Sequence, residues 1–266
     1  MKKISLHIKK AIETFNQPEM RILPGNIAFF FVLALIPIIT MLVVIASYFS
    51  ISIDTVITFI DNLLPKEASN LIIDVISGKG FDSSVGVFNI IALFVASNGT
   101  YAIVSASNTL YQVTKSDSLK DRIKAIILLL ILLMLIIFLL IVPIFGEKIL
   151  ALFETTPFIE TLRIIYKIGQ WPLTIFTIYV NLKLIYTIAP SIRVTSESTT
   201  YGAMFTTTIW SIATAVFSYY LSHFANYNVL YGNLSSLIIL MMWLYIISYV
   251  FVMGIAINVT NFEQNT

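Results

Sequence analysis

The chain has 266 residues, of which 58% are hydrophobic and 11% are charged, and it contains no cysteine. Soluble globular proteins carry about 25% charged residues, so this composition excludes an ordinary soluble domain and indicates an integral membrane protein. The lack of cysteine excludes disulfides, thiolate metal sites and cysteine catalysis. A formal net charge of +2 is too small to favour nucleic acid as a partner.

The first 22 residues predict a cytoplasmic amphipathic segment. Ile4, Ile8, Ile12 and Phe15 recur at helical spacing, and lysines surround them. A basic helix of this kind lies on the anionic inner leaflet of a membrane, and membrane lipids are then its partners. A solvated tail is the alternative.

Six apolar stretches are long enough to cross a hydrocarbon core about 30 Å thick, which takes about 20 helical residues. These predicted spans are residues 27–49, 87–111, 123–145, 171–189, 201–224 and 234–259. We therefore expect a single membrane domain over residues 1–266. Its fold class is all-α, a polytopic bundle of six transmembrane helices with an N-terminal amphipathic helix and a helical outer loop.

Lysine and arginine are unevenly distributed in this topology. Eleven of the 16 fall before the first span or near the connections on that side, and five fall on the opposite side. Because short loops rich in these residues stay in the cytoplasm, both termini are predicted to be cytoplasmic.

The first outer loop predicts a helical hairpin. Its first half has an apolar face and its second half a shorter apolar pattern at residues 71–76, with Pro65 between them. We expect these apolar stripes to pack on the surface of the bundle. A cap over a cavity is the alternative.

Several residues within the first two spans are candidates for a substrate pathway or a hinge. Pro37 removes one helical hydrogen bond and predicts a kink in span one. In span two, Asn98 and Asn108 stand among small residues and Gly99 permits a break. Such amides line a pathway or, alternatively, join helices by hydrogen bonds.

Span four contains Asn181 and Lys183. Lys183 either extends its ammonium group to the inner interface or faces a cavity together with Asn181. No Asp or Glu lies within the six predicted spans, so a carboxylate relay has no candidate. A ligand held by Lys183 is therefore expected to be anionic.

The connection between spans five and six reads FANYNVLYGNLSS. Amides are costly in hydrocarbon, so this segment is either an aqueous turn or a site. An aromatic belt and a glycine turn account for most of it, and the turn is the first interpretation. The candidate pathway residues are Asn226, Tyr227, Tyr231 and Asn233, with Gly232 as a hinge.

The residues do not predict an enzyme or a cofactor. The chain has two histidines, His7 and His223, without a paired histidine motif, a metal-type cluster or a catalytic triad. A phosphate-binding loop is also absent from the sequence.

A series of residues in the last third of the chain resembles the YihY/BrkB family of bacterial inner-membrane proteins. The series comprises Pro190, Gly202-Ala203, Trp210, Phe217, Tyr220, Phe224, Asn226-Tyr227, Tyr231-Gly232, Leu234, Trp243-Leu244-Tyr245, Gly254 and Asn258, with Pro37, Asn108 and Tyr111 earlier. The resemblance covers nearly the whole chain. It implies six helices, a plasma-membrane location and a role in transport or lipid handling.

The chain departs from the family pattern at two positions. Gly254-Ile255-Ala256 lacks the acid that the family tends to have there, and Ala34 replaces a common serine. Mechanisms assigned to those two residues do not carry over. The family's former label, ribonuclease BN, also has no support here, because no metal site or RNA-binding surface is recognisable.

The sequence favours a transporter or flippase-like protein for an anionic or amphiphilic substrate, such as a lipid or an envelope precursor. The basis is the polar groups within the spans, Lys183 without a carboxylate partner, and the resemblance. A non-transporting scaffold of the cell envelope and a passive channel are the alternatives. Substrate identity, coupling energy and oligomeric state are not determined by these residues.

Overall fold

The computed structural model describes residues 18–48, 51–63, 69–70, 73, 86–114, 117–153, 158–224 and 231–265. Most of the predicted N-terminal segment lies outside these ranges. So does most of the second half of the predicted outer hairpin.

Helices make up nearly all of the described chain, and no strand occurs in those ranges. Each predicted span corresponds to one long helix, which confirms the all-α class. The six are α2 (Glu19–Tyr48), α5 (Gly86–Leu110), α6 (Ser118–Leu152), α7 (Ile159–Ile188), α8 (Thr200–Phe224) and α10 (Ser235–Asn265).

By length and apolar composition, three helices of the described chain are able to cross a membrane: Ser118–Leu139 within α6, Ile159–Ile188 (α7), and Ser235–Glu263 within α10. A fourth is added when the two arms of α2 count as one span. The protein is thus a polytopic membrane protein. The crossing of α5 and α8 stays a prediction.

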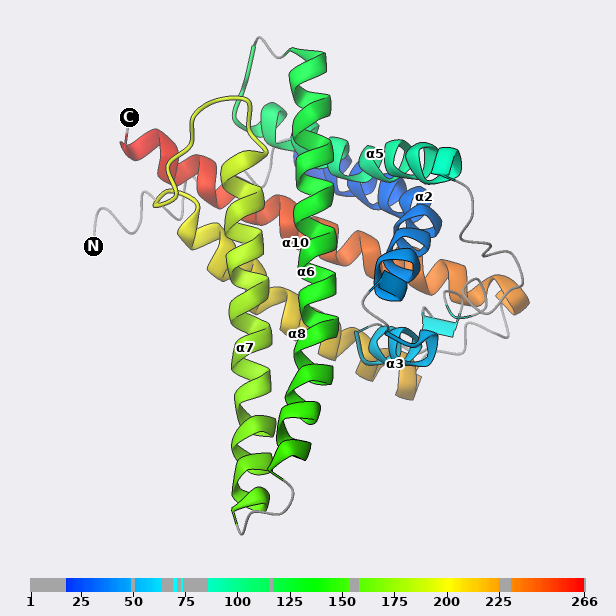
Figure 1. The fold of residues 1–266 in the computed structure, drawn as a ribbon. Helices are drawn as coiled ribbons and strands as arrows, with labels where there is room; N and C mark the ends of the chain where they lie inside the picture. Colours follow the sequence, from blue (N-terminus) through cyan, green and yellow to red (C-terminus); the bar gives the residue numbers. More distant parts are fainter. Residues whose placement is uncertain are drawn as a thin grey trace.

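The long helices pack as a closed series. Each contacts the next one along the chain, and α10 returns to contact α2. Figure 1 shows α6 and α7 as a long pair that extends away from the remaining helices, while α5 and α10 run across this pair at a steep angle. The largest buried apolar cluster draws residues from α2, α5, α6, α7, α8 and α10.

The first helix is bent where a proline was expected to kink it. The arms Glu19–Leu35 and Pro37–Ile45 of α2 meet at 51°. Proline explains the bend, because its ring removes a backbone donor and clashes with the preceding turn. In the second arm of α2, Ile39 is buried against Val56 and Ile60 of α3 (Ile53–Leu63). The first half of the outer loop therefore packs on the bundle as predicted.

Candidate functional site

A tight corner joins α5 to α6 and brings the polar groups at their ends together. At the end of α5, the N–H of Val113 donates to the carbonyl of Asn108 at 2.9 Å, and Gln112 adopts φ 53°. Helices commonly end with one residue in the left-handed conformation, which is usually glycine and here is Gln112. Asp117 precedes α6 and accepts the N–H of Leu119 at 3.1 Å. This bond, with a smaller contribution from Lys120, lowers the pKa of the Asp117 carboxyl group.

The corner holds a group of polar side chains, of which Asn108 and Asp121 are buried and Lys124 and Ser191 are half-buried. We name these four residues the polar junction. Asp121 accepts hydrogen bonds from Asn108 Nδ2 at 3.2 Å and from Ser191 Oγ at 2.5 Å. Asn108 Oδ1 accepts the N–H of Ser191 at 2.7 Å. The exposed fractions of Asn108 and Asp121 are 8% and 4%. The junction therefore ties α5, α6 and the loop between α7 and α8 to one another.

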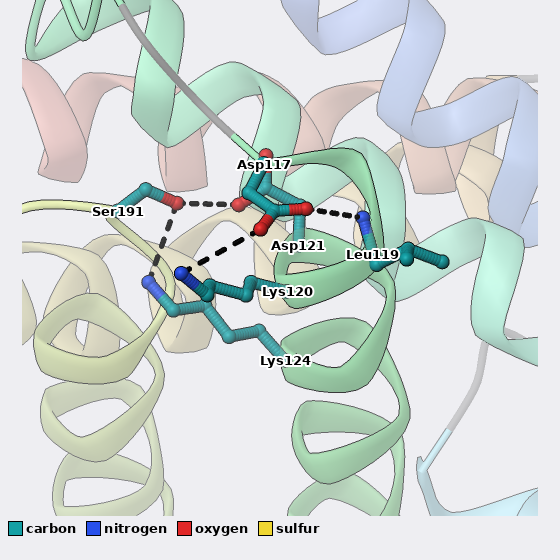
Figure 2. A network of polar contacts seen from close by, with 6 residues as sticks. All are labelled: Asp117, Leu119, Lys120, Asp121, Lys124 and Ser191. Atoms are coloured by element: carbon teal, nitrogen blue, oxygen red, sulfur yellow. Dashed lines mark hydrogen bonds and ion pairs between the residues drawn. The ribbon is translucent and has the colours of Figure 1, made fainter.

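Lys124 completes the polar junction from the next turn of α6. Its Nζ donates to the carbonyl of Pro190 at 2.7 Å and to Ser191 Oγ at 3.3 Å. Figure 2 shows Lys124 and Asp121 reaching Ser191 from the same helix, while Lys120 turns to Asp117 on the exposed side. The loop before α8 is thereby held between an ammonium group and a carboxylate.

The expectation that no acid lies within a span holds for the predicted residues 123–145 but not for the helix that contains them. Helix α6 begins at Ser118, five residues before the predicted start, and the part of α6 that is able to cross a membrane, Ser118–Leu139, includes Asp121. The other two helices of this kind also include an acid at one end, Glu160 in α7 and Glu263 in α10. Asp117 was the available signal for the earlier start of α6, because aspartate favours the position that caps a helix.

Asn98 does not face an open space. Its Oδ1 accepts a hydrogen bond from Arg122 Nη1 at 2.8 Å, and Arg122 Nη2 donates to the carbonyl of Phe94 at 2.9 Å. Asn98 therefore lies level with the first turns of α6. The neighbouring Gly99 continues the helix without a break and packs on Phe31 and Ala34 of α2.

A second polar region runs along one side of α10. Trp210 Nε1 donates to the carbonyl of Ile247 at 2.7 Å, and the Tyr186 hydroxyl donates to the carbonyl of Phe251 at 2.9 Å. Two turns further, Asn258 Oδ1 accepts the N–H of Gly202 at 2.9 Å. Together with Trp243 and Gly254, the α10 positions recur every three or four residues, so they share a helical face. We name Trp243, Ile247, Phe251, Gly254 and Asn258 the polar face of α10.

The helices approach each other closely at this face. A methyl group added to Gly202 would lie 2.2 Å from the carbonyl oxygen of Gly254, and one added to Gly254 would lie 2.1 Å from Thr206 Oγ1. The Thr206 hydroxyl is 2.7 Å from that of Tyr186. Glycine is required at both positions because any side chain would separate the backbones of α8 and α10.

Four buried polar atoms beside this face have no hydrogen-bond partner among the described residues. They are Trp243 Nε1 and Asn258 Nδ2 on α10, and Ser107 Oγ and Tyr111 Oη at the end of α5. The ring of Tyr111 packs edge-on against Phe262, with centroids 5.6 Å apart, and Phe262 lies one turn after Asn258. Ser107 lies one turn before Tyr111 and therefore on the same side of the helix. We infer that the C-terminal ends of α5 and α10 face each other, with unpaired polar groups between them.

The remaining candidates on α7 lie apart from each other. Asn181 Nδ2 donates to Thr177 of its own helix at 3.1 Å. Asn181 and Lys183 flank the buried Leu182 on either side. Successive helical residues are turned by about 100°, so the two side chains point about 200° apart and do not face one cavity.

The connection between α8 and α10 is described from Tyr231 onward. Tyr231 is 46% exposed, and Gly232 has φ 52° at the start of a short helix, Gly232–Leu234. The left-handed φ is the reason for glycine in this turn. Asn226, Tyr227 and the side chain of Asn233 lie outside what the structure describes, so their role stays a prediction.

Comparison with known proteins identifies the family. A family model described as virulence factor BrkB matches residues 11–266. The chain belongs to the BrkB family. The resemblance seen in the sequence is thereby confirmed.

Curated relatives support the membrane assignment. A protein of Bacillus subtilis named ribonuclease-like, YfkH, is 28% identical over 256 residues, which cover 94% of this chain and 93% of YfkH. UPF0761 membrane proteins match shorter stretches. One from Pseudoalteromonas translucida is 32% identical over 75 residues, or 28% of this chain and 25% of that protein. One from Tolumonas auensis is 32% identical over 80 residues, or 30% of this chain and 26% of that protein. No solved structure matches the chain.

Proposed function

We propose that this BrkB-family protein is a transporter or flippase-like protein for an anionic or amphiphilic substrate, such as a lipid or an envelope precursor. We place it in the bacterial inner membrane with both termini in the cytoplasm, as the distribution of lysine and arginine favours. The observation that carries the proposal is the polar face of α10 with its unpaired neighbours on α5.

An unpaired buried polar group costs about 1–3 kcal/mol, so a helix pair that only held the fold together would gain by apolar replacements. Here Ser107, Tyr111 and Asn258 each keep a buried polar atom without a hydrogen-bond partner among the described residues. Tyr111 packs on Phe262, so these groups lie where the end of α5 meets the end of α10. Polar groups in that position suit a substrate whose headgroup passes between the ends of α5 and α10.

The proposal does not include a nuclease activity, despite the name of the relative YfkH. Hydrolysis of RNA by a metal needs a group of ligands, and among the described residues no group of three or more His, Asp or Glu side chains is placed to hold one. A non-transporting scaffold and a passive channel are the competing functions.

Tyr111 allows a sharp test, because none of the described residues forms a hydrogen bond with its hydroxyl. Tyr111→Phe should leave the fold intact but should slow translocation of fluorescent anionic lipids in reconstituted vesicles by roughly tenfold, if the hydroxyl contacts the substrate. Tyr186→Phe is the matched control. Its hydroxyl has partners on α8 and α10, so this change should lower the melting temperature.

Three outcomes would contradict the proposal. Translocation no faster than in empty vesicles, over several headgroups, would remove the lipid substrate. Equal translocation by Tyr111→Phe and the wild type would remove the path between α5 and α10. A steady ion conductance in planar bilayers would replace the transporter with a channel.

A further inference from the structure

We propose that Arg122, which extends from α6 to α5, binds the phosphate of an anionic membrane phospholipid. The inference concerns a different surface from the polar face of α10. It stands whether or not the protein moves a substrate.

Arg122 is held in a fixed orientation with donors left over. Its guanidinium group carries five N–H donors, and the hydrogen bonds to Asn98 and to the Phe94 carbonyl use two of them. The group lies 3.9 Å from the centroid of the Phe94 ring and 5.7 Å from that of Tyr101. Its buried Nε has no hydrogen-bond partner in the part of the chain that the structure describes. Such a planar fork, already oriented, matches the oxygens of a phosphate.

The positive charge of Arg122 is not balanced within the described residues. The adjacent Asp121 points inward and is committed to Asn108 and Ser191. The ion pair between Lys120 and Asp117 lies on the exposed start of the helix. An arginine within a membrane helix that lacks a carboxylate partner is a site for an anion from outside the protein.

The side chains around Arg122 indicate a lipid rather than a free ion. On α5, the two rings near the Arg122 guanidinium are exposed, Phe94 by 58% and Tyr101 by 36%, and on α6 the next residue, Ile123, is 58% exposed. Exposed apolar side chains on both helices suit acyl chains, and aromatic rings near a cation are typical of the headgroup level. Basic pockets between membrane helices bind anionic headgroups in the same way.

The test measures which lipids stay with the purified protein. Wild type is reconstituted in nanodiscs with equal amounts of phosphatidylglycerol and phosphatidylcholine, then returned to mild detergent, and retained lipid is counted by native mass spectrometry. We expect retention of phosphatidylglycerol over phosphatidylcholine. Arg122→Gln should reduce that preference by about tenfold, because charge-assisted hydrogen bonds are lost.

Two further variants keep the result decisive. Lys120→Gln removes the same charge two residues away and should retain the preference. Arg122→Lys keeps the charge and is the readout if Arg122→Gln does not fold. It should lose most of the preference, because lysine has no planar fork.

Equal retention of both lipids by the wild type would overturn the proposal. An equal preference in the wild type and Arg122→Lys would overturn it too. Loss of phosphatidylglycerol when inorganic phosphate is added would instead assign the site to a free anion.

Discussion

The α6–α7 pair and α10 are all apolar enough to cross a membrane, yet they differ in what surrounds them. Half of the residues in the apolar part of α10 are buried, against 22% in α6 and 17% in α7. The pair exposes Met134, Ile168 and Trp171, each by more than 65%. The helix α10 instead carries a polar face that receives hydrogen bonds from α7 and α8. Apolar composition therefore identifies both as membrane helices but does not separate a lipid-facing helix from a central one.

The largest effect is expected from Gly202→Ala. The new methyl group would meet the backbone oxygen of Gly254, which has little freedom to move. We expect a loss of about 3 kcal/mol, or a fall in melting temperature of about 6 °C or more. Gly169→Ala on α7 is the matched control, because nothing lies within 4 Å of its position. Equal melting temperatures for both variants in detergent would show that α10 is not closely packed.

Asp121→Ala should cost about 2–3 kcal/mol, because Asn108 and Ser191 would lose their acceptor in a buried place. Glu160→Ala removes an exposed carboxylate at the start of α7 and should change stability by less than about 0.5 kcal/mol. Thermal unfolding at fixed pH measures both. A stable Asp121→Ala protein would mean that the polar junction does not hold the α7–α8 loop.

Two positions on α7 sharpen the comparison within one helix. Leu182→Ala should destabilise by about 2 kcal/mol, because Leu182 is buried in the main cluster. Ile168→Ala should be nearly neutral, since Ile168 is 67% exposed. The same loss at both positions would show that a protein surface, and not lipid, covers the α6–α7 pair.

The smallest effect is a gain. Gln112→Gly should stabilise the end of α5 by about 0.5 kcal/mol, because Gln112 holds a left-handed φ that glycine adopts freely. A small rise in melting temperature would support this reading of the corner. A fall would mean that the glutamine side chain contributes more than its backbone strain costs.

Much of the fold could be predicted from the sequence, because apolar stretches of fixed length mark membrane helices. The kink at Pro37 and the turn at Gly232 followed from residues with restricted or unusual backbone angles. The site was less accessible. Asp121 was left out of the predicted span 123–145, because charged residues in the first turn of a helix cannot be told from loop residues by hydropathy.

The polar face of α10 was hidden for a different reason. Its hydrogen-bond acceptors at Ile247 and Phe251 are backbone carbonyls, so the side chains in the sequence do not indicate them. Trp243, Gly254 and Asn258 entered only as part of the family resemblance. The sequence did contain a signal for this face, because the spacing of these three residues places them on one side of a helix and Gly202 permits close packing against it.

The contact of Gly202 with Gly254 has a mechanical consequence. Two backbones that touch allow rotation about the point of contact but resist separation, since separation breaks the hydrogen bond from Gly202 to Asn258. Any motion of α7 and α8 against α10 is therefore expected to turn about this contact as a fulcrum. Small changes at one end of α8 would then appear as larger, opposite displacements at its far end.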